Sequence, residues 1–116
     1  MKLKIKRVYE EPEPGGGKRV LVDRLWPRGL AKEQAEVDLW LKDIAPSTEL
    51  RKWYGHQPER WPAFRTKYLK ELERNPEAVA ELRKVARGKT VALLYGARDR
   101  ERNQAVVLAE FLRSKA

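Results

Sequence analysis

The sequence predicts an α/β fold, a single small domain with a mostly parallel sheet and flanking helices. Short apolar runs that suit buried strands occur early and late in the chain, at residues 20–22 and 90–95. Between these runs, apolar residues recur at helical spacing over residues 47–87. Strands that alternate with helices are typical of a parallel sheet covered by helices.

Size and composition set the outer limits of this interpretation. A chain of 116 residues suits one domain, here residues 1–116, with one core. The formal charge of +9 and the pI of about 10.0 fit phosphate-bearing partners. Acids and bases are mixed along the chain, however, which also fits a solvated surface rich in ion pairs, as in heat-adapted proteins.

Several classes of site are unsupported by the composition. The chain has no cysteine, which removes disulfides, thiolate catalysis and cysteine-based zinc sites, and one histidine cannot build a multi-histidine metal site. No apolar run approaches the ~20 residues of a membrane span, and the lysine-rich start is too polar for a secretory signal. We therefore expect a cytoplasmic protein with no membrane contact, metal or cofactor.

The first half of the chain reads as strands joined by loops. Residues 2–9 alternate apolar residues with lysines, as a half-buried or edge strand does. Residues 10–17 contain two prolines and the run Gly15 to Gly17, so we expect a mobile loop that could act as a lid. Residues 19–25 form the second predicted strand, covered on both faces. Residues 30–37 suit a short helix or a loop, and residues 38–44 a short strand.

The second half reads as helices around one central strand. Ser47 is a good N-cap for a helix whose Leu50, Trp53 and Tyr54 face inward. Residues 55–58 break that helix, and apolar residues at helical spacing then continue to residue 74. Residues 75–77 start a further helix that stops at Gly88. Residues 90–95 form the strand at the sheet centre, and Asp99 is the expected N-cap of the last helix.

Polar and aromatic residues follow both inner strands. One group comes after the second strand, and the other after the central strand: Asp23, Arg24, Trp26 and Arg28, and then Arg98, Asp99 and Asn103. Ligands of open α/β sheets bind outside the carboxyl ends of the strands. If the two strands are parallel neighbours, both groups lie at one rim of the sheet.

The charged candidates each have two interpretations. The guanidinium groups of Arg24 and Arg28 match phosphate or carboxylate oxygens, or they pair with acids such as Asp23 to lock the loop. Asp23 could act as a base, cap a turn, or orient Arg51 or Arg98. His56 could act as an acid or base, or satisfy carbonyls at a helix end.

The aromatic and amide candidates likewise have both a functional and a structural interpretation. Trp26 leaves the core beside two arginines, where an indole could stack on a ligand, and Trp53 could do the same; large aromatics are usually core. Asn103 could hydrogen-bond a ligand near a helix N-terminus that favours anions, and Asp99 lies beside it. Ser47 has no nucleophile-elbow motif around it, and N-capping explains it.

A set of motifs in fixed order carries a family resemblance. They are Asp23-Arg-Leu-Trp-Pro-Arg-Gly29, Trp40-Leu-Lys-Asp-Ile-Ala-Pro-Ser47, Leu50-Arg-Lys-Trp-Tyr-Gly-His56 and Leu94-Tyr-Gly-Ala-Arg-Asp99. The chain resembles the bacterial YeaO-like branch of a domain family of unknown function, from about residue 8 to residue 112. The resemblance implies a small cytosolic α/β protein and no established reaction. Longer relatives carry cysteine and histidine after the last strand, whereas residues 94–103 contain neither here, so thiol or metal chemistry is not supported.

Three functional hypotheses follow. The leading one is a protein that binds a phosphate- or carboxylate-bearing small molecule at the carboxyl-end rim through Arg24, Arg28, Arg51 and Arg98. Whether a reaction follows is open, and Asp23 and His56 are the candidate acid and base. The alternative is a basic nucleic-acid-binding module without a helix-turn-helix. The third is an interaction protein that oligomerises through exposed aromatics.

Overall fold

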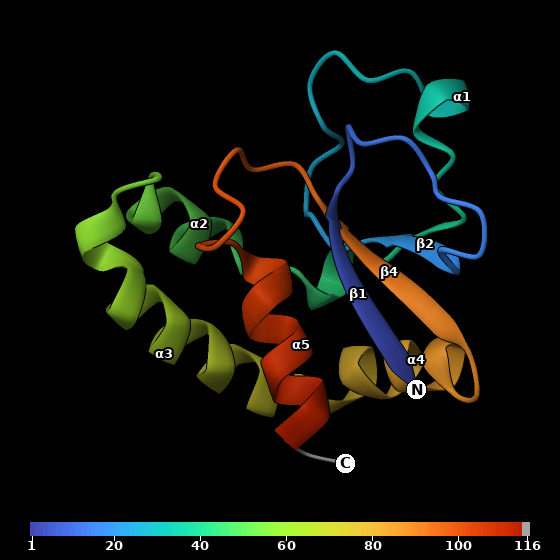
Figure 1. Ribbon diagram of the computed structural model, residues 1–116. Coiled ribbons are helices and arrows are strands. Elements are labelled where there is room, and N and C mark those ends of the chain that lie inside the picture. The colour runs from blue at the N-terminus through green and yellow to red at the C-terminus, as the bar shows by residue number, and fades with distance from the viewer. Residues whose placement is uncertain (115–116) are drawn as a thin grey trace.

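A four-stranded parallel sheet forms the centre of the computed structural model, which describes residues 1–114 (Figure 1). Across the sheet the strands are β1 (Lys2–Arg7), β4 (Thr90–Tyr95), β2 (Lys18–Leu21) and β3 (Leu39–Trp40). Every neighbouring pair is parallel. The predicted α/β class is confirmed, with β4 inside the sheet and β1 at its edge.

The other regular elements of residues 1–114 are helical. They are α1 (Lys32–Ala35), α2 (Thr48–Tyr54), α3 (Trp61–Glu73), α4 (Pro76–Ala86) and α5 (Gln104–Ser114), with 3-10 turns η1 (Lys42–Ile44) and η2 (Pro58–Arg60). Helices α2, α3, α4 and α5 lie on one side of the sheet, and α1 lies on the other with long loops (Figure 1). The region of residues 30–37 therefore contains a single helical turn.

The sheet divides the core into two clusters. Val20, Val22 and Leu93 pack toward the long helices, while Leu21 and Leu94 pack toward the loop side. This alternation follows from the two-residue period of a strand. All five side chains are fully buried, which is why residues 20–22 read as one continuous apolar run.

The two inner strands end at the same rim. Leu21 of β2 is in register with Leu94 of β4, and the Val22 amide donates to the Leu94 carbonyl at 3.0 Å. The loops that follow these strands, beginning at Asp23 and Gly96, therefore start side by side. This geometry was the condition for a shared site.

Three strands are shorter than predicted, and the first of them, β1, ends at Arg7 rather than at residue 9. Strand β2 ends at Leu21 rather than at residue 25, and β3 has only the two residues Leu39 and Trp40. The indole Nε1 of Trp40 donates to the backbone carbonyl of Asp23 at 2.7 Å. This side-chain bond thus takes the place of the next backbone hydrogen bond between β2 and β3. The chain can therefore turn away from the sheet at Asp23.

Helix α2 is capped as predicted but faces differently. The Ser47 hydroxyl accepts from the Leu50 amide at 3.1 Å. Trp53, predicted to face inward, is 38% exposed. The guanidinium of Arg60 and the ammonium of Lys67 lie 5.3 and 5.2 Å from the centroid of its ring. Cation–π contacts stabilise an indole ring that lies outside the core.

The start of α5 also differs from the prediction. Asn103, not Asp99, caps the helix, because the Asn103 Oδ1 accepts from the Val106 amide at 3.1 Å. Asp99 instead closes the preceding turn, where its Oδ1 accepts from the amides of Glu101 and Arg102, both at 2.9 Å. The bonds that Asp99 receives lower the pKa of its carboxyl group.

The glycine run lies at the opposite end of the sheet from the carboxyl rim. Gly17 has φ +86°, and a Cβ on it would lie 2.3 Å from the carbonyl oxygen of Thr90, the first residue of β4. Glycine is therefore required for the backbone to approach the amino end of β4. Gly17 itself therefore lies away from the carboxyl-end rim, and a lid formed by the loop of residues 10–17 stays a prediction.

Candidate functional site

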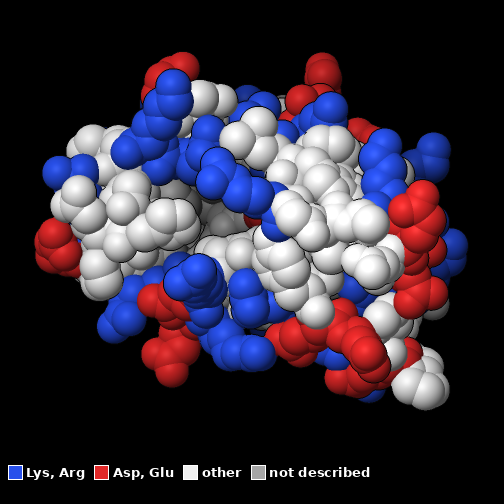
Figure 2. Space-filling view, turned by 90° about the horizontal axis from the view of Figure 1, so that it is seen from above, with Lys and Arg blue, Asp and Glu red and all other residues white. Residues whose placement is uncertain are grey.

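A cavity of about 550 Å³ opens at the carboxyl end of the sheet. Its walls come from the loops after β2 and β4, from α2 with the turn that follows it, and from Tyr9 after β1. Figure 2 looks onto this end of the molecule and shows the hollow with lysine and arginine side chains on both sides of it. A cavity of this size suits a small-molecule ligand.

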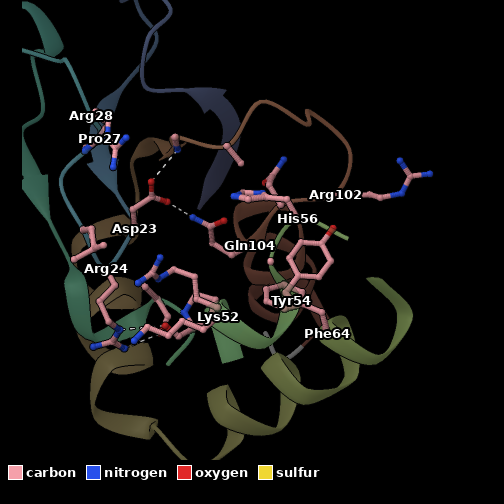
Figure 3. Close-up of a pocket in the computed structure, with 18 of the residues that line it drawn as sticks. Asp23, Arg24, Pro27, Arg28, Lys52, Tyr54, His56, Phe64, Arg102 and Gln104 are labelled. Carbon is pink, nitrogen blue, oxygen red and sulfur yellow. Dashed lines mark hydrogen bonds between the residues drawn. The ribbon is translucent and has the colours of Figure 1, made fainter. Parts of the chain in front are cut away.

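Asp23 is the acid of this cavity, and the loop after β4 and the start of α5 position its carboxyl group. Its Oδ2 accepts from the Gly96 amide at 2.9 Å, and its Oδ1 accepts from the side-chain amide of Gln104, the first residue of α5 (Figure 3). Burial raises the pKa of Asp23 to about 6, against the opposing effects of these two bonds and of the Arg51 charge. Asp23 therefore titrates just below neutral pH.

Gly96 is the residue that allows this arrangement. A Cβ at position 96 would lie 2.9 Å from the Asp23 Oδ2, closer than real Cβ contacts. The absence of a side chain lets the carboxylate reach the backbone amide directly. The contact joins the loop after β2 to the loop after β4.

Arg24 lines the cavity wall but is engaged by the backbone. Its Nε donates to the Pro46 carbonyl at 3.1 Å, and one terminal nitrogen donates to the Ala45 carbonyl at 2.9 Å (Figure 3). These bonds hold the segment that leads into α2. The two backbone bonds account for the position of the Arg24 guanidinium. The partners predicted from the sequence, a ligand anion or Asp23, are not needed to explain it.

Four further basic side chains surround the opening, and all four are exposed. Arg28 comes from the loop after β2, Arg51 and Lys52 from α2, and Arg102 from the loop before α5. Figure 3 shows Arg28 and Arg102 on opposite sides of the space in front of Asp23. Cations from three separate segments thus face a common space.

Aromatic side chains form the apolar part of the wall. Trp26 is half-buried, its Nε1 donates to the Leu30 carbonyl at 2.7 Å, and its ring packs edge-on against Trp40 at 5.4 Å between centroids. Tyr54 and Phe64 pack together with centroids 4.6 Å apart on the side of the long helices. Trp26 is therefore anchored by packing while one part of it lines the cavity.

His56 also lines the cavity, in an uncommon backbone conformation. It has φ 59° and follows Gly55 at φ 52°, so two successive residues adopt the left-handed region. Its exposed ring lies 6.3 Å from that of Tyr54. Such a conformation costs free energy at a non-glycine residue, and here it turns the imidazole toward the opening after α2 ends.

The structure brings most, though not all, of the predicted site residues together. Those that line the cavity are Asp23, Arg24, Trp26, Arg28, Arg51, His56 and Asn103. Arg98, Asp99 and Trp53 do not line it. Asn103 is 3% exposed, and its side chain is used by the α5 cap and by a bond to the Asp99 carbonyl at 3.0 Å.

Sequence reasoning missed Lys52, Tyr54, Arg102 and Gln104 as wall residues. Lys52 follows Arg51 on the same short helix, and Gln104 follows Asn103 at a helix start, so adjacency to a predicted residue was the available signal. Within residues 1–114, no group of three or more histidine, cysteine or acidic side chains is placed to hold a metal ion. In the same residues, no helix is long and apolar enough to cross a membrane.

Comparison with known proteins places the chain in a family. The model of the inactive DUF488-N3 subclade matches residues 2–116. An uncharacterised protein of Mycobacterium tuberculosis is 45% identical over 114 residues, covering 98% of this chain and 96% of that protein. The uncharacterised protein YeaO of Escherichia coli is 43% identical, covering 98% and 99% of the two chains. No solved structure matches. The chain therefore belongs to the YeaO-like proteins of the inactive DUF488-N3 subclade.

Proposed function

We propose that this protein binds a small anionic molecule, bearing a phosphate or a carboxylate, in the cavity at the carboxyl end of the sheet. The observation that carries the proposal is the convergence of Arg28, Arg51, Lys52 and Arg102 from three segments on one space of about 550 Å³. Guanidinium groups offer a planar fork of donors that matches phosphate or carboxylate oxygens. Like charges that gather without an anion repel one another, so an anion between them relieves that repulsion.

The cavity also has room for the body of such a ligand. Trp26, Tyr54 and Phe64 contribute aromatic surface to its wall. Binding sites for small molecules commonly combine an apolar wall with a few polar groups that fix orientation. We propose a ligand whose anionic group meets the basic side chains at the opening while its apolar part lies against the aromatic wall.

The family description calls the subclade inactive. This description supports a protein that binds the anionic molecule without converting it. Asp23 and His56 remain the two predicted acid and base groups. Anion binding in the cavity does not require either of them to take part in a reaction. Catalysis would require a bound substrate between these two side chains.

The test uses thermal stability with defined probes. Wild-type protein is heated with inorganic phosphate, citrate or phenyl phosphate at constant ionic strength, and Tm is measured. A probe at about 100 times its Kd adds about 2.7 kcal/mol to stability, which corresponds to a rise in Tm on the order of 10 °C for a chain of 116 residues. The double variant Arg28→Ala, Arg51→Ala should lose this rise. Arg24 is left intact, because its bonds to Ala45 and Pro46 support the fold.

A matched variant controls for net charge. Arg74→Ala, Arg87→Ala removes the same two charges from exposed positions that do not line the cavity. It should keep the rise in Tm with each probe that stabilises the wild type. Absence of any rise in wild type, or an equal rise in the Arg28→Ala, Arg51→Ala variant, would contradict the proposal.

A further inference from the structure

An acid inside a basic cavity needs an explanation of its own. Four exposed cations surround the opening, yet Asp23 places a carboxylate among them in a half-buried position. Among residues 1–114, none of the ion pairs within 4.0 Å involves Asp23. A carboxylate that serves only to neutralise an arginine would form such a pair.

The known contacts of Asp23 do not require a charge. It accepts one bond from the Gly96 amide and one from the Gln104 side chain. A neutral asparagine has an oxygen for Gly96, and Gln104 can turn its own oxygen toward the new amide nitrogen. An uncharged residue of the same shape would therefore keep the contacts with Gly96 and Gln104.

The carboxylate has acceptor capacity that the protein does not use. Its two oxygens offer about four lone-pair positions, and the described side chains and backbone fill two of them. Figure 3 shows the Asp23 carboxylate at the open space of the cavity with Gln104 on one side of it, and the other oxygen accepts from the Gly96 amide. The unused positions are available to a donor inside the cavity.

We propose that Asp23 accepts a hydrogen bond from an ammonium or other N–H donor of the ligand, so that the ligand is a zwitterion with an anionic group at one end and an amine at the other. This inference rests on the proposed function and specifies its ligand class. The basic side chains at the opening hold the anion. Asp23 holds the amine, and the aromatic wall covers the apolar segment between the two ends.

Two matched pairs of probes test the amine. The short pair is O-phosphoethanolamine and ethyl phosphate, and the long pair is 4-(aminomethyl)phenyl phosphate and 4-ethylphenyl phosphate. Titration calorimetry at pH 7.5 gives a Kd for each. In at least one pair we expect the amine to bind about tenfold tighter or more, since a charge-assisted hydrogen bond to a half-buried carboxylate is stronger than a neutral one. Asp23→Asn should abolish that preference while leaving the affinity for the amine-free probe unchanged or raised.

The control is Glu77→Gln, which removes an acid from an exposed position on α4 outside the cavity. It should retain the preference. If the amine-free probes bind and the amine gives no advantage in either pair, or if Asp23→Asn keeps the advantage, the inference is overturned and the anion site stands. If none of the four probes binds, the inference is overturned, and the anion site is overturned with it when inorganic phosphate, citrate and phenyl phosphate also leave the Tm of the wild type unchanged.

Discussion

Asp23 destabilises the fold in its charged form. A carboxyl group whose pKa rises from its ordinary 3.8 to about 6 on folding is held in an environment that disfavours its charge. The corresponding cost at neutral pH is at most roughly 3 kcal/mol. The same residue lies in the cavity where it can meet a ligand. A costly ionisable group in a cavity is a common property of functional sites.

The first consequence concerns the stability of Asp23→Asn. Because the folded pKa is raised, the wild type loses stability relative to the neutral variant as pH rises from about 4 to about 6. We expect Asp23→Asn to have a higher Tm than wild type at pH 8, by several degrees, and an equal Tm near pH 4. Calorimetry across this range measures the difference. A difference that is constant with pH, or a variant less stable at pH 8, would contradict the assignment.

The position of a residue at the rim was predictable where a strong apolar run comes before it. Asp23 and Arg28 lie in the loop that follows the apolar run of residues 20–22, and both line the cavity. The position of Arg102 was not predictable, because the loop of residues 96–103 has no periodicity to say which side chains return to the cavity. Trp53 was misplaced because Arg60 at the end of η2 and Lys67 on α3 both contact its ring, and the spacing of apolar residues within α2 does not show these contacts.

At the level of elements, α2 places two of the four cations, and its position depends on one serine. The Ser47 hydroxyl accepts from the Leu50 amide and donates to Glu71 Oε2 at 2.6 Å, while the Ser47 amide donates to Glu71 Oε1 at 2.8 Å. Glu71 lies on α3. The cap thus fixes the start of α2 and its attachment to the neighbouring helix together.

Removal of this cap gives the second stability prediction. Ser47→Ala loses the bond to Leu50 and the hydroxyl bond to Glu71, and we expect it to lower the free energy of unfolding by about 1–2 kcal/mol. Thr48→Ala, at the exposed first residue of α2, is the matched control and should change it by less than about 0.5 kcal/mol. Urea denaturation measures both. Equal midpoints for the two variants would show that the cap is not what fixes α2.

Element types were largely predictable, and element ends were not. The apolar runs of β2 and β4 and the helical spacing of α3 and α4 are strong local signals. Asp99 and Asn103 are both good caps, and only the path of the loop decides that Asn103 precedes the helix. The predicted strand of residues 38–44 shrank to β3 because Trp40 turns its indole onto Asp23.

The charge of the whole molecule bears on the alternative hypothesis, nucleic-acid binding. The net charge is +9, but acidic side chains lie among the basic ones in Figure 2, and the basic groups there border a hollow. Nucleic acid binds best to a continuous basic surface and releases counterions as it does so. A hollow ringed by cations suits a small anion better than a long one.

We therefore expect weak oligonucleotide binding. For single-stranded and duplex DNA of 20 nucleotides at 150 mM salt, Kd should be no tighter than about 10 µM, within the range of non-specific contacts. Fluorescence anisotropy at several salt concentrations measures it. A Kd in the nanomolar range with a steep loss of affinity as salt rises would favour the nucleic-acid module instead.

The brevity of β3 has a consequence for self-association. One edge strand of the sheet, β3, consists of two residues, and the other edge strand, β1, carries Lys2, Lys4 and Lys6. Short or lysine-bearing borders are poor templates for a further strand from another copy. Both edges of the sheet therefore disfavour the addition of a strand from another copy, which protects the sheet against growing into fibrils.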